Sequence, residues 1–193
     1  MGSRPERETT DDHELVLRTK RGDRSAFEIL VRRYQDRTYN VAYQILRHRE
    51  DALDVAQEAF ARAYVSIARF RGTAGFYTWL YRILVNLAID RARARGRENP
   101  ISLDEPMRDI TLGGKTADPA ATLETKELRQ QIVRAVACLP ADQRAALTLR
   151  EIDGLSYQEI ARIMKCSNGT VMSRLYAARQ KLQRILGHYA KAQ

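Results

Sequence analysis

The sequence predicts an all-α protein with two small helical domains joined by a flexible linker. Apolar residues recur at helical spacing in both halves of the chain, and no stretch alternates as a strand would. Between the halves, residues 98–125 lose this periodicity and contain three prolines and a Gly113-Gly114 pair. These observations predict domains over residues 1–97 and 126–193, with residues 98–125 as an extended, mobile linker.

The charge of the chain is divided in the same way. The net charge is +9 over 193 residues, and the three segments carry net charges of +6, −4 and +7 in chain order. A basic balance of this size favours a polyanionic partner such as a nucleic acid. Two basic domains around an acidic connector therefore predict two separate contacts on one nucleic acid.

Composition gives no sign of a membrane span, a metal or a cofactor. No apolar run approaches the roughly 18 residues of a spanning helix, and the polar start is unlike a signal peptide. Cys138 and Cys166 are expected to be small buried thiols in a reducing compartment, with a disulfide or a redox switch as the alternative. Because His13, His48 and His188 lie far apart in sequence, we expect no metal site. The prediction is a cytoplasmic protein without a cofactor.

Four helices are expected in the first domain. Asp11 or Asp12 caps a short helix that ends near Gly22, and Asp23 caps a long helix over residues 24–47. The third helix runs from about residue 50 to about residue 70, and the fourth covers about residues 78–95. The apolar positions expected inside the third helix are Leu53, Val55, Ala56, Ala59, Phe60, Ala63, Tyr64 and Ile67.

The third helix also carries a row of acids. Asp51, Asp54 and Glu58 are spaced by three and four residues, which places their carboxylates along one edge with Gln57 beside them. In a basic protein such a row suits a basic protein partner. A solvated face that only balances charge fits the pattern equally well.

A glycine-bearing loop over residues 71–75 is followed directly by four aromatic residues, Phe76, Tyr77, Trp79 and Tyr81. Glycine mobility beside aromatic faces and arginines suits an unstacked base and its backbone. An aromatic core cluster is the alternative, and we expect core packing more for Trp79 than for Tyr77.

The fourth helix adds polar groups to this region. Arg82, Asn86 and Asp90 repeat every four residues along one face. Arginines at positions 91, 93, 95 and 97 crowd the end of the helix, where positive charge suits the helix dipole and can also hold phosphate.

The second domain is expected to open with a helix over residues 126–139, followed by a helix over 143–151 that Asp142 caps. Residues 155–182 then predict a helix, a tight turn and a second helix. Ser156 and Glu159 have capping-box spacing at the start of the first.

The second helix of this pair, capped by Ser167 or Asn168, has one apolar and one polar face. Away from the apolar side it presents Gly169, Met172, Ser173, Tyr176 and Gln180, with Ala177 at the margin and Arg174 and Arg179 on the flanks. This layout is typical of a helix-turn-helix that places its second helix in the major groove of DNA. An ordinary helical hairpin is the alternative.

Four segments resemble the bacterial extracytoplasmic-function (ECF) sigma factors, most closely the sigma-E type. They are DALDVAQEAFARAY (51–64), FYTWLYRILVNLAIDRARARGR (76–97), LPADQRAALTLREIDGLSYQEIARIM (139–164) and GTVMSRLYAARQKL (169–182). The resemblance implies that residues 1–97 are sigma region 2, which binds core RNA polymerase and recognises and melts the downstream promoter element. It implies that residues 126–193 are sigma region 4, which reads the upstream element as duplex DNA.

Site residues follow from the same resemblance, position by position. Those implied to dock on the clamp coiled coil of the largest polymerase subunit are Asp51, Asp54, Gln57 and Glu58. Those implied to capture a flipped base and the melted strand of the downstream element are Phe70, Arg71, Tyr77, Trp79, Arg82 and Asn86. Those implied to face the upstream element are Ser167, Asn168, Thr170, Met172, Ser173, Arg174, Tyr176 and Arg179.

The chain departs from the family pattern at Met172 and Ala177, where many relatives carry a basic or polar side chain. Fewer direct hydrogen bonds to bases are then available, so we expect weaker or shifted upstream specificity, with Met172 offering an apolar contact. The resemblance also implies a docking site on the flap of the second-largest polymerase subunit and an inhibitory anti-sigma factor, often membrane-anchored. It implies no small-molecule substrate.

Two other classes of function fit the sequence less well. A stand-alone helix-turn-helix regulator would bind DNA as a dimer, but the sequence has no heptad seam, and this hypothesis leaves the acidic row and the glycine-aromatic loop without a role. An enzyme acting on nucleic acid would need paired carboxylates in a nuclease context, a phosphate-cradling loop or an activated nucleophile, and none is recognisable.

Overall fold

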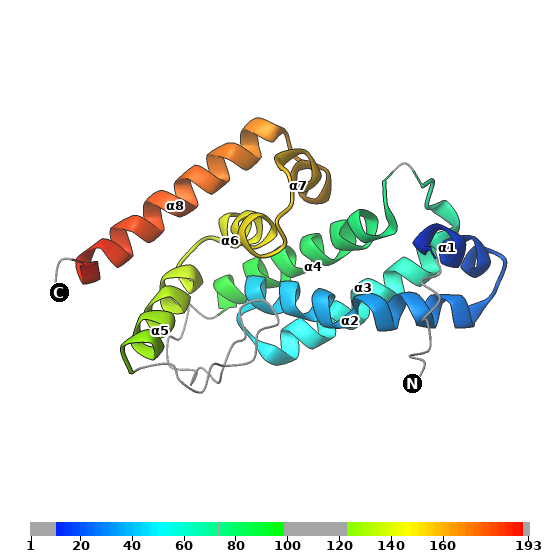
Figure 1. Ribbon diagram of the computed structural model, residues 1–193, viewed down its shortest axis with the longest axis horizontal. Helices are drawn as coiled ribbons and strands as arrows, with labels where there is room; N and C mark the ends of the chain where they lie inside the picture. Colours follow the sequence, from blue (N-terminus) through cyan, green and yellow to red (C-terminus); the bar gives the residue numbers. More distant parts are fainter. Residues whose placement is uncertain (1–10, 73, 99–122, 191–193) are drawn as a thin grey trace, which may run out of the picture.

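The computed structural model describes residues 11–72, 74–98 and 123–190, and within these ranges every regular element is a helix (Figure 1). Most of the predicted linker lies outside them. In the described ranges, no helix is long and apolar enough to cross a membrane.

The first unit contains α1 (Asp12–Lys20), α2 (Arg24–Leu46), α3 (Arg49–Ser66) and α4 (Phe76–Glu98). A short 3-10 turn, η1 (Ile67–Arg69), ends the third helix of the unit. The three long helices pack on one another around a common apolar core, and α1 lies across the end of α2. The predicted long helix over 24–47 is therefore one uninterrupted element.

The second unit contains α5 (Leu123–Ala137), α6 (Ala141–Leu147), α7 (Tyr157–Met164) and α8 (Asn168–Ala190). A π-helical turn, η3 (Thr148–Ile152), continues α6. The first helix begins three residues before its predicted start at 126, so the last residues assigned to the linker are helical.

Local sequence signals account for several helix ends. The Asp23 side chain accepts a hydrogen bond from the Ala26 amide at the start of α2. At α7 the predicted capping box is present, because Ser156 and Glu159 bond reciprocally. Lys165 adopts the left-handed conformation that ends α7, and the Ser167 hydroxyl accepts from the Thr170 amide at 3.1 Å, which caps α8.

Three expectations about single residues are wrong. Asp142 does not cap α6; it lies in the first turn and binds arginines instead. Leu53 and Tyr64 were expected inside, yet they are 50% and 38% exposed. A helical period identifies the apolar side of α3, but at the margin of that side burial depends on which neighbouring helix is present.

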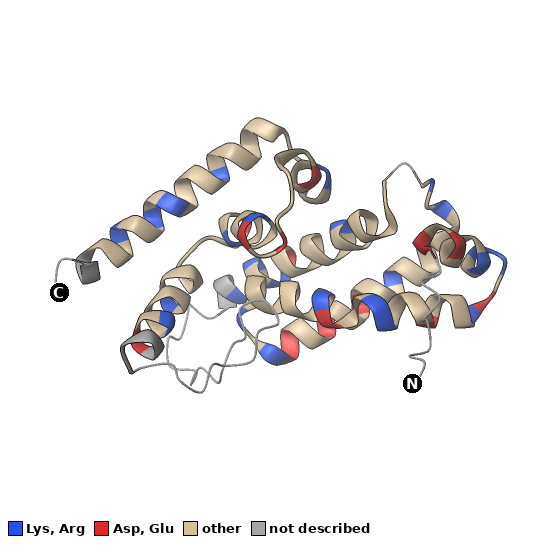
Figure 2. Ribbon diagram, in the orientation of Figure 1, with Lys and Arg blue, Asp and Glu red and all other residues tan. Residues whose placement is uncertain are grey.

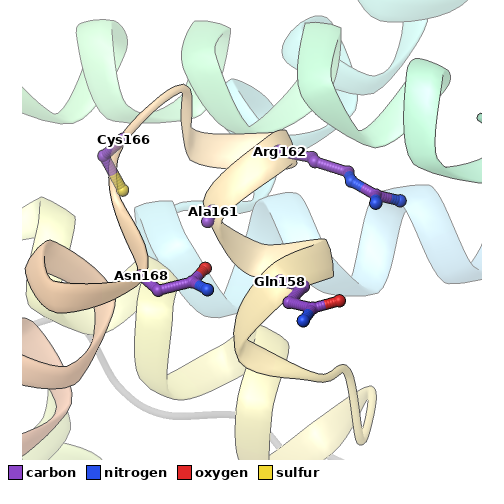
Figure 3. Close-up of a pocket in the computed structure, with 5 residues that line it drawn as sticks. All are labelled: Gln158, Ala161, Arg162, Cys166 and Asn168. Atoms are coloured by element: carbon purple, nitrogen blue, oxygen red, sulfur yellow. The ribbon is translucent and has the colours of Figure 1, made fainter.

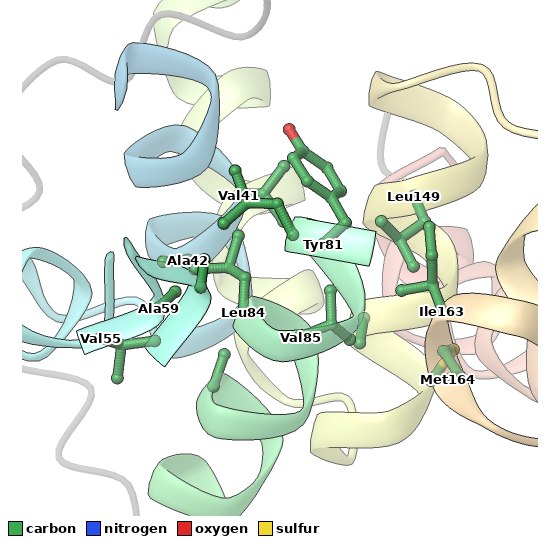
Figure 4. Close-up of a cluster of buried hydrophobic side chains, with 14 of the residues drawn as sticks. Val41, Ala42, Val55, Ala59, Tyr81, Leu84, Val85, Leu149, Ile163 and Met164 are labelled. Carbon is green, nitrogen blue, oxygen red and sulfur yellow. The ribbon is translucent and has the colours of Figure 1, made fainter. Parts of the chain in front are cut away.

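The two units pack directly on each other through α7 on α4 and α6 on α2 and α4. Figure 4 shows that Tyr81 and Val85 of α4 lie beside Leu149, Ile163 and Met164 of the second unit. These five side chains are at most 7% exposed and belong to one apolar cluster that continues into α2 and α3. We call this arrangement, with the second unit seated on α4, the closed arrangement.

Polar contacts surround the apolar patch. Arg37 Nε lies 3.0 Å from Asp153 Oδ1. On α4, the Asn86 amide donates to the Ile163 carbonyl at 3.4 Å, and Arg93 pairs with Asp142 at 2.6 Å. Because hydrogen bonds and ion pairs have preferred geometry, these contacts fix how α6 and α7 sit on the first unit.

One buried arginine joins the two units from within. Arg144 of α6 is 8% exposed, and its Nε donates to the Ile45 carbonyl at the end of α2 at 2.5 Å. Its Nη1 donates to the carbonyl of Ala137, the last residue of α5, at 2.8 Å and to that of Leu139, two residues further on, at 3.4 Å. Burial and the nearby Arg47 charge lower the pKa of Arg144 to about 10, so it stays charged at neutral pH.

We predict that Arg144→Ala lowers the free energy of unfolding by about 2–4 kcal/mol, because three carbonyl oxygens lose their donor. Urea denaturation followed by circular dichroism measures the change. Arg184→Ala on the exposed side of α8 is the control and should stay within about 0.5 kcal/mol of the unsubstituted chain. Equal unfolding midpoints for the two variants would contradict the bridging role of Arg144.

Candidate nucleic-acid interface

The outward face of α3 combines acids with exposed apolar groups. Asp54 and Gln57 are exposed and Glu58 is half-buried, where it accepts a hydrogen bond from Arg62 at 2.6 Å. Leu53 is 50% exposed on the same face, and Val65 toward the end of the helix is 83% exposed. An exposed mixture of carboxylates and large apolar side chains is typical of a protein-binding surface.

Asp51 is placed differently from the other members of the acidic row. It points to α4, where its two carboxylate oxygens accept from Arg91 at 3.0 Å and Arg95 at 2.7 Å. The His48 ring lies 3.3 Å from the same carboxylate. In this structure Asp51 therefore holds α3 to the end of α4, and its contact with a partner stays a prediction.

Two of the predicted strand-binding residues, Phe70 and Trp79, belong to an aromatic cluster. Phe70 is 7% exposed and packs against Trp79 and Phe76, with ring centroids 5.0 and 6.4 Å away. Lys20 donates to the Phe70 carbonyl at 2.5 Å, which ties α1 to this cluster. Arg71 next to it is exposed. Phe70 and Trp79 thus form a wall of the core from which the loop projects.

Gly72 gives the loop after this cluster its shape. Its φ of +72° is strained for residues with a side chain, and a Cβ there would meet no atom within 4 Å. The glycine is needed for its backbone conformation rather than for space.

Tyr77 and Asn86 lie where the second unit covers α4. The ring centroids of Tyr77 and Tyr81 lie 4.0 Å apart with the rings tilted by 37°, and the Arg37 guanidinium lies 4.7 Å from the Tyr77 centroid. Burial, together with the charge of Asp153, raises the pKa of Tyr77 to about 12. The Asn86 amide is bonded to the Ile163 carbonyl of α7. Arg82, one turn before Asn86, is exposed.

The helix-turn-helix consists of α7 and α8, and it leaves the face that would read DNA open. The apolar face of α8 consists of Val171, Leu175 and Ala178, which are at most 1% exposed against the rest of the unit. On the opposite side Met172 is 56% and Tyr176 is 64% exposed. The helix α8 contains no acid, and Figure 2 shows basic residues recurring along it. Ser167 and Thr170 bond each other at its start.

The two flanking arginines differ in their contacts. Arg174 is held by Asp142 at 3.3 Å and lies 3.6 Å from the Cys166 sulfur, so it braces α8 against α6. Arg179 pairs with Glu151 at 2.7 Å on the surface. Surface pairs of this kind exchange readily, so Arg179 is the better placed of the two to reach a phosphate.

A shallow hollow lies between α7 and the start of α8 (Figure 3). It is lined by Gln158, Ala161, Arg162, Cys166 and Asn168. Gln158 lines the hollow from α7 and Asn168 lines it from the start of α8, whereas the Arg162 side chain extends away. The small side chain of Ala161 leaves the hollow open, whereas a larger side chain at this position would extend into it. Cys166 and Cys138 are both free and half-buried, so no disulfide joins them.

Two residues with a place in these surfaces were missed by the sequence reasoning. Leu53 was assigned to the core, although its place beside Asp54 on the edge of the apolar side could have indicated the surface. Arg37 was not singled out, because only the fold brings it to Tyr77. No group of three metal-ligating side chains occurs in the parts of the chain that the structure covers.

Comparison with known families matches both units. Residues 30–98 match the family described as Sigma-70 region 2, and residues 129–182 match the family described as Sigma-70, region 4. The two matches lie in the two units of the structure and avoid most of the predicted linker.

Curated relatives match nearly the whole chain. It is 44% identical over 182 residues to the ECF RNA polymerase sigma-E factor of Escherichia coli strain K12, which covers 91% of this chain and 94% of the relative. It is 39% identical over 186 residues to the RNA polymerase sigma-H factor of Pseudomonas aeruginosa, with coverages of 91% and 93%.

Solved structures share the fold. A structure of CnrH in complex with the cytosolic domain of CnrY has a TM-score of 0.66 at 24% identity and covers 92% of this chain and 97% of that one. A structure of the sigma factor RpoE in complex with the anti-sigma factor NepR from Bartonella quintana has a TM-score of 0.61 at 27% identity, with coverages of 83% and 96%.

The exposure of Met172 leads to a prediction for duplex DNA. Met172→Arg should tighten binding to duplex DNA and steepen its salt dependence by about one unit of slope, because one more phosphate is neutralised. Fluorescence anisotropy over a salt series measures both quantities. Met172→Leu is the matched control, and a slope for Met172→Arg equal to that of the control would refute the prediction.

Proposed function

The chain belongs to the ECF sigma factors of the sigma-70 family, and from this premise we propose how its surfaces serve transcription. The protein binds core bacterial RNA polymerase and directs promoter-specific initiation. We assign residues 1–97 to core binding and the downstream element, residues 98–125 to the linker, and residues 126–193 to the upstream element. It acts in the cytoplasm, where the polymerase is, and it supplies no bond-making group itself.

The outward face of α3 is the observation that carries this proposal. Asp54, Gln57 and Glu58 surround the half-exposed Leu53, which gives a docking surface with an apolar centre and a charged border. A stand-alone regulator that needs only DNA has no use for such a surface. We propose that this face docks on the clamp coiled coil of the largest polymerase subunit and that Asp51 supports it from behind.

The proposed strand-binding surface lies on the loop after Phe70 and along α4. Arg71 and Arg82 are exposed and can hold backbone phosphates, whereas Tyr77 and Asn86 offer a ring and an amide to an unstacked base. Flipping a base costs a few kcal/mol, and stacking worth about 1–3 kcal/mol per base offsets that cost. Phe70 and Trp79 hold the loop in place and form the back of this surface.

The upstream element is read by the open face of α8. Met172, Ser173 and Tyr176 face the major groove, while Arg179 and the start of the helix at Ser167, Asn168 and Thr170 approach phosphates. Arg174 keeps α8 in position. Since Met172 cannot donate hydrogen bonds, its contact is apolar, for instance to a thymine methyl group.

Protein inhibitors are the expected regulators. The structure of RpoE with NepR shows a sigma factor bound to an anti-sigma factor. We propose that an anti-sigma factor, of the membrane-anchored kind, binds this chain and that the flap of the second-largest polymerase subunit contacts its second unit. The inducing signal belongs to a stress or envelope response in this proposal.

Transcription in vitro tests the proposal directly. Purified bacterial core polymerase is incubated with fragmented genomic DNA, with and without the protein, and the RNA starts are sequenced. Defined starts that need the protein are expected, and the aligned upstream sequences give both promoter elements. If no such starts appear while the protein alone shifts specific duplex DNA, the stand-alone regulator is the correct function.

A charge reversal on α3 tests the docking surface. Asp54→Lys should weaken binding to core polymerase about tenfold or more, because a like charge then faces a basic partner. Glu28→Lys makes the same change on an exposed position of α2 and is the matched control. Titration of labelled protein with core polymerase measures the affinities. Equal affinities for the two variants would move the docking site away from α3.

A further inference from the structure

An arginine outside the predicted site reaches the proposed strand-binding surface. Arg37 lies on the solvent side of α2, with its side chain 51% exposed. Its guanidinium lies 4.7 Å from the centroid of the Tyr77 ring on α4. A cation over an aromatic face is the pair that binds the phosphate and the base of one unstacked nucleotide.

In the closed arrangement the guanidinium of Arg37 is paired with a carboxylate, that of Asp153. Arg37 Nε lies 3.0 Å from Asp153 Oδ1, although the two residues are 116 positions apart in the chain. The Asp153 side chain is only 4% exposed. Because carboxylate and phosphate oxygens bind a guanidinium in the same way, Asp153 takes the position that a strand phosphate would take.

The hydrogen-bonding capacity of the Asp153 carboxylate is only partly used in the closed arrangement. Its Oδ2 has no hydrogen-bond partner within the described ranges, and the same is true of the buried hydroxyls of Tyr77 and Tyr81. Burial raises the pKa of Asp153, while Arg37 acts in the opposite direction. A buried carboxylate with one oxygen left without a hydrogen-bond partner stabilises a contact little, so Arg37 can exchange Asp153 for another anion.

We propose that Arg37 binds a backbone phosphate of the melted promoter strand. While the second unit is closed on α4, Asp153 binds Arg37 instead of that phosphate. The inference rests on the proposed function of α4 as the strand-binding surface. Since Asp153 directly follows η3 and so belongs to the second unit, strand capture by Arg37 and separation of the two units are coupled in this proposal. The alternative is an ion pair that only holds the units together.

The contact is tested on the holoenzyme. The probe is a fluorescein-labelled, fork-shaped DNA whose single strand carries the downstream element mapped by the RNA starts. Arg37→Gln should weaken binding about 5-fold to 10-fold and lower the salt slope by about 0.7, the value for one phosphate on a single strand. Arg37→Lys should retain most of the slope. Arg32→Gln, an exposed arginine on the same helix, is the matched control.

The masking is tested on the free full-length chain with the same labelled strand. Asp153→Asn should raise affinity about 3-fold to 10-fold, because Arg37 loses its internal anion. Glu127→Gln removes one exposed charge from α5 and should leave affinity unchanged. Thermal unfolding of each variant confirms that the fold is retained.

Each result decides a separate point. A slope for Arg37→Gln equal to that of Arg32→Gln overturns the phosphate contact, and equal affinities for Asp153→Asn and Glu127→Gln overturn the masking. Arg82→Gln separates these failures from failure of the proposed function. If Arg82→Gln weakens strand binding while Arg37→Gln does not, only the inference about Arg37 is wrong. If no protein-dependent RNA starts exist and neither variant changes strand binding, the inference and the proposed function are both wrong.

Discussion

The arrangement of the molecule depends on the apolar contact between α4 and α7. Burying a side chain such as Ile163 or Leu149 is worth about 1.5–3 kcal/mol, whereas an exposed ion pair at the border of the contact, such as Arg93–Asp142, is worth about 0–1 kcal/mol. Apolar burial therefore sets the strength of the contact. The directional contacts of Arg37, Asn86 and Arg93 determine where along α4 the second unit sits.

Placing α7 on α4 affects the two proposed DNA surfaces unequally. Asn86 is bonded to Ile163, and Tyr77 is half-buried beside Asp153, so half of the strand-binding surface is covered. Met172 and Tyr176 on α8 remain more than half exposed. A ligand that binds only the open arrangement has its affinity reduced in proportion to the fraction of molecules in that state. The penalty falls on the melted strand and not on the duplex.

The sequence predicts the parts of this structure that depend on local physics. Helical periods, the capping box of Ser156 and Glu159 and the cap at Asp23 need only neighbouring residues, and the structure confirms them. Contacts across the chain were not predictable. Asp51 turns toward Arg91 and Arg95 because α4 lies beside it, and Asp142 serves Arg93 and Arg174 because α6 packs between two helices. A spacing rule places such acids on a face but does not identify what that face meets.

The surfaces left open in the closed arrangement imply an order of events under the proposed assignments. The outward face of α3, with Leu53 and Asp54, is accessible while α7 covers α4, so polymerase can dock on it before the units separate. Docking alone does not open the molecule, since a ligand shifts an equilibrium only by its difference in affinity for the two states. The polymerase must therefore also bind the second unit in a position that it reaches only after leaving α4. Under these assignments, separation then uncovers Tyr77 and Asn86 and releases Arg37 from Asp153, so that all three become available to the promoter strand.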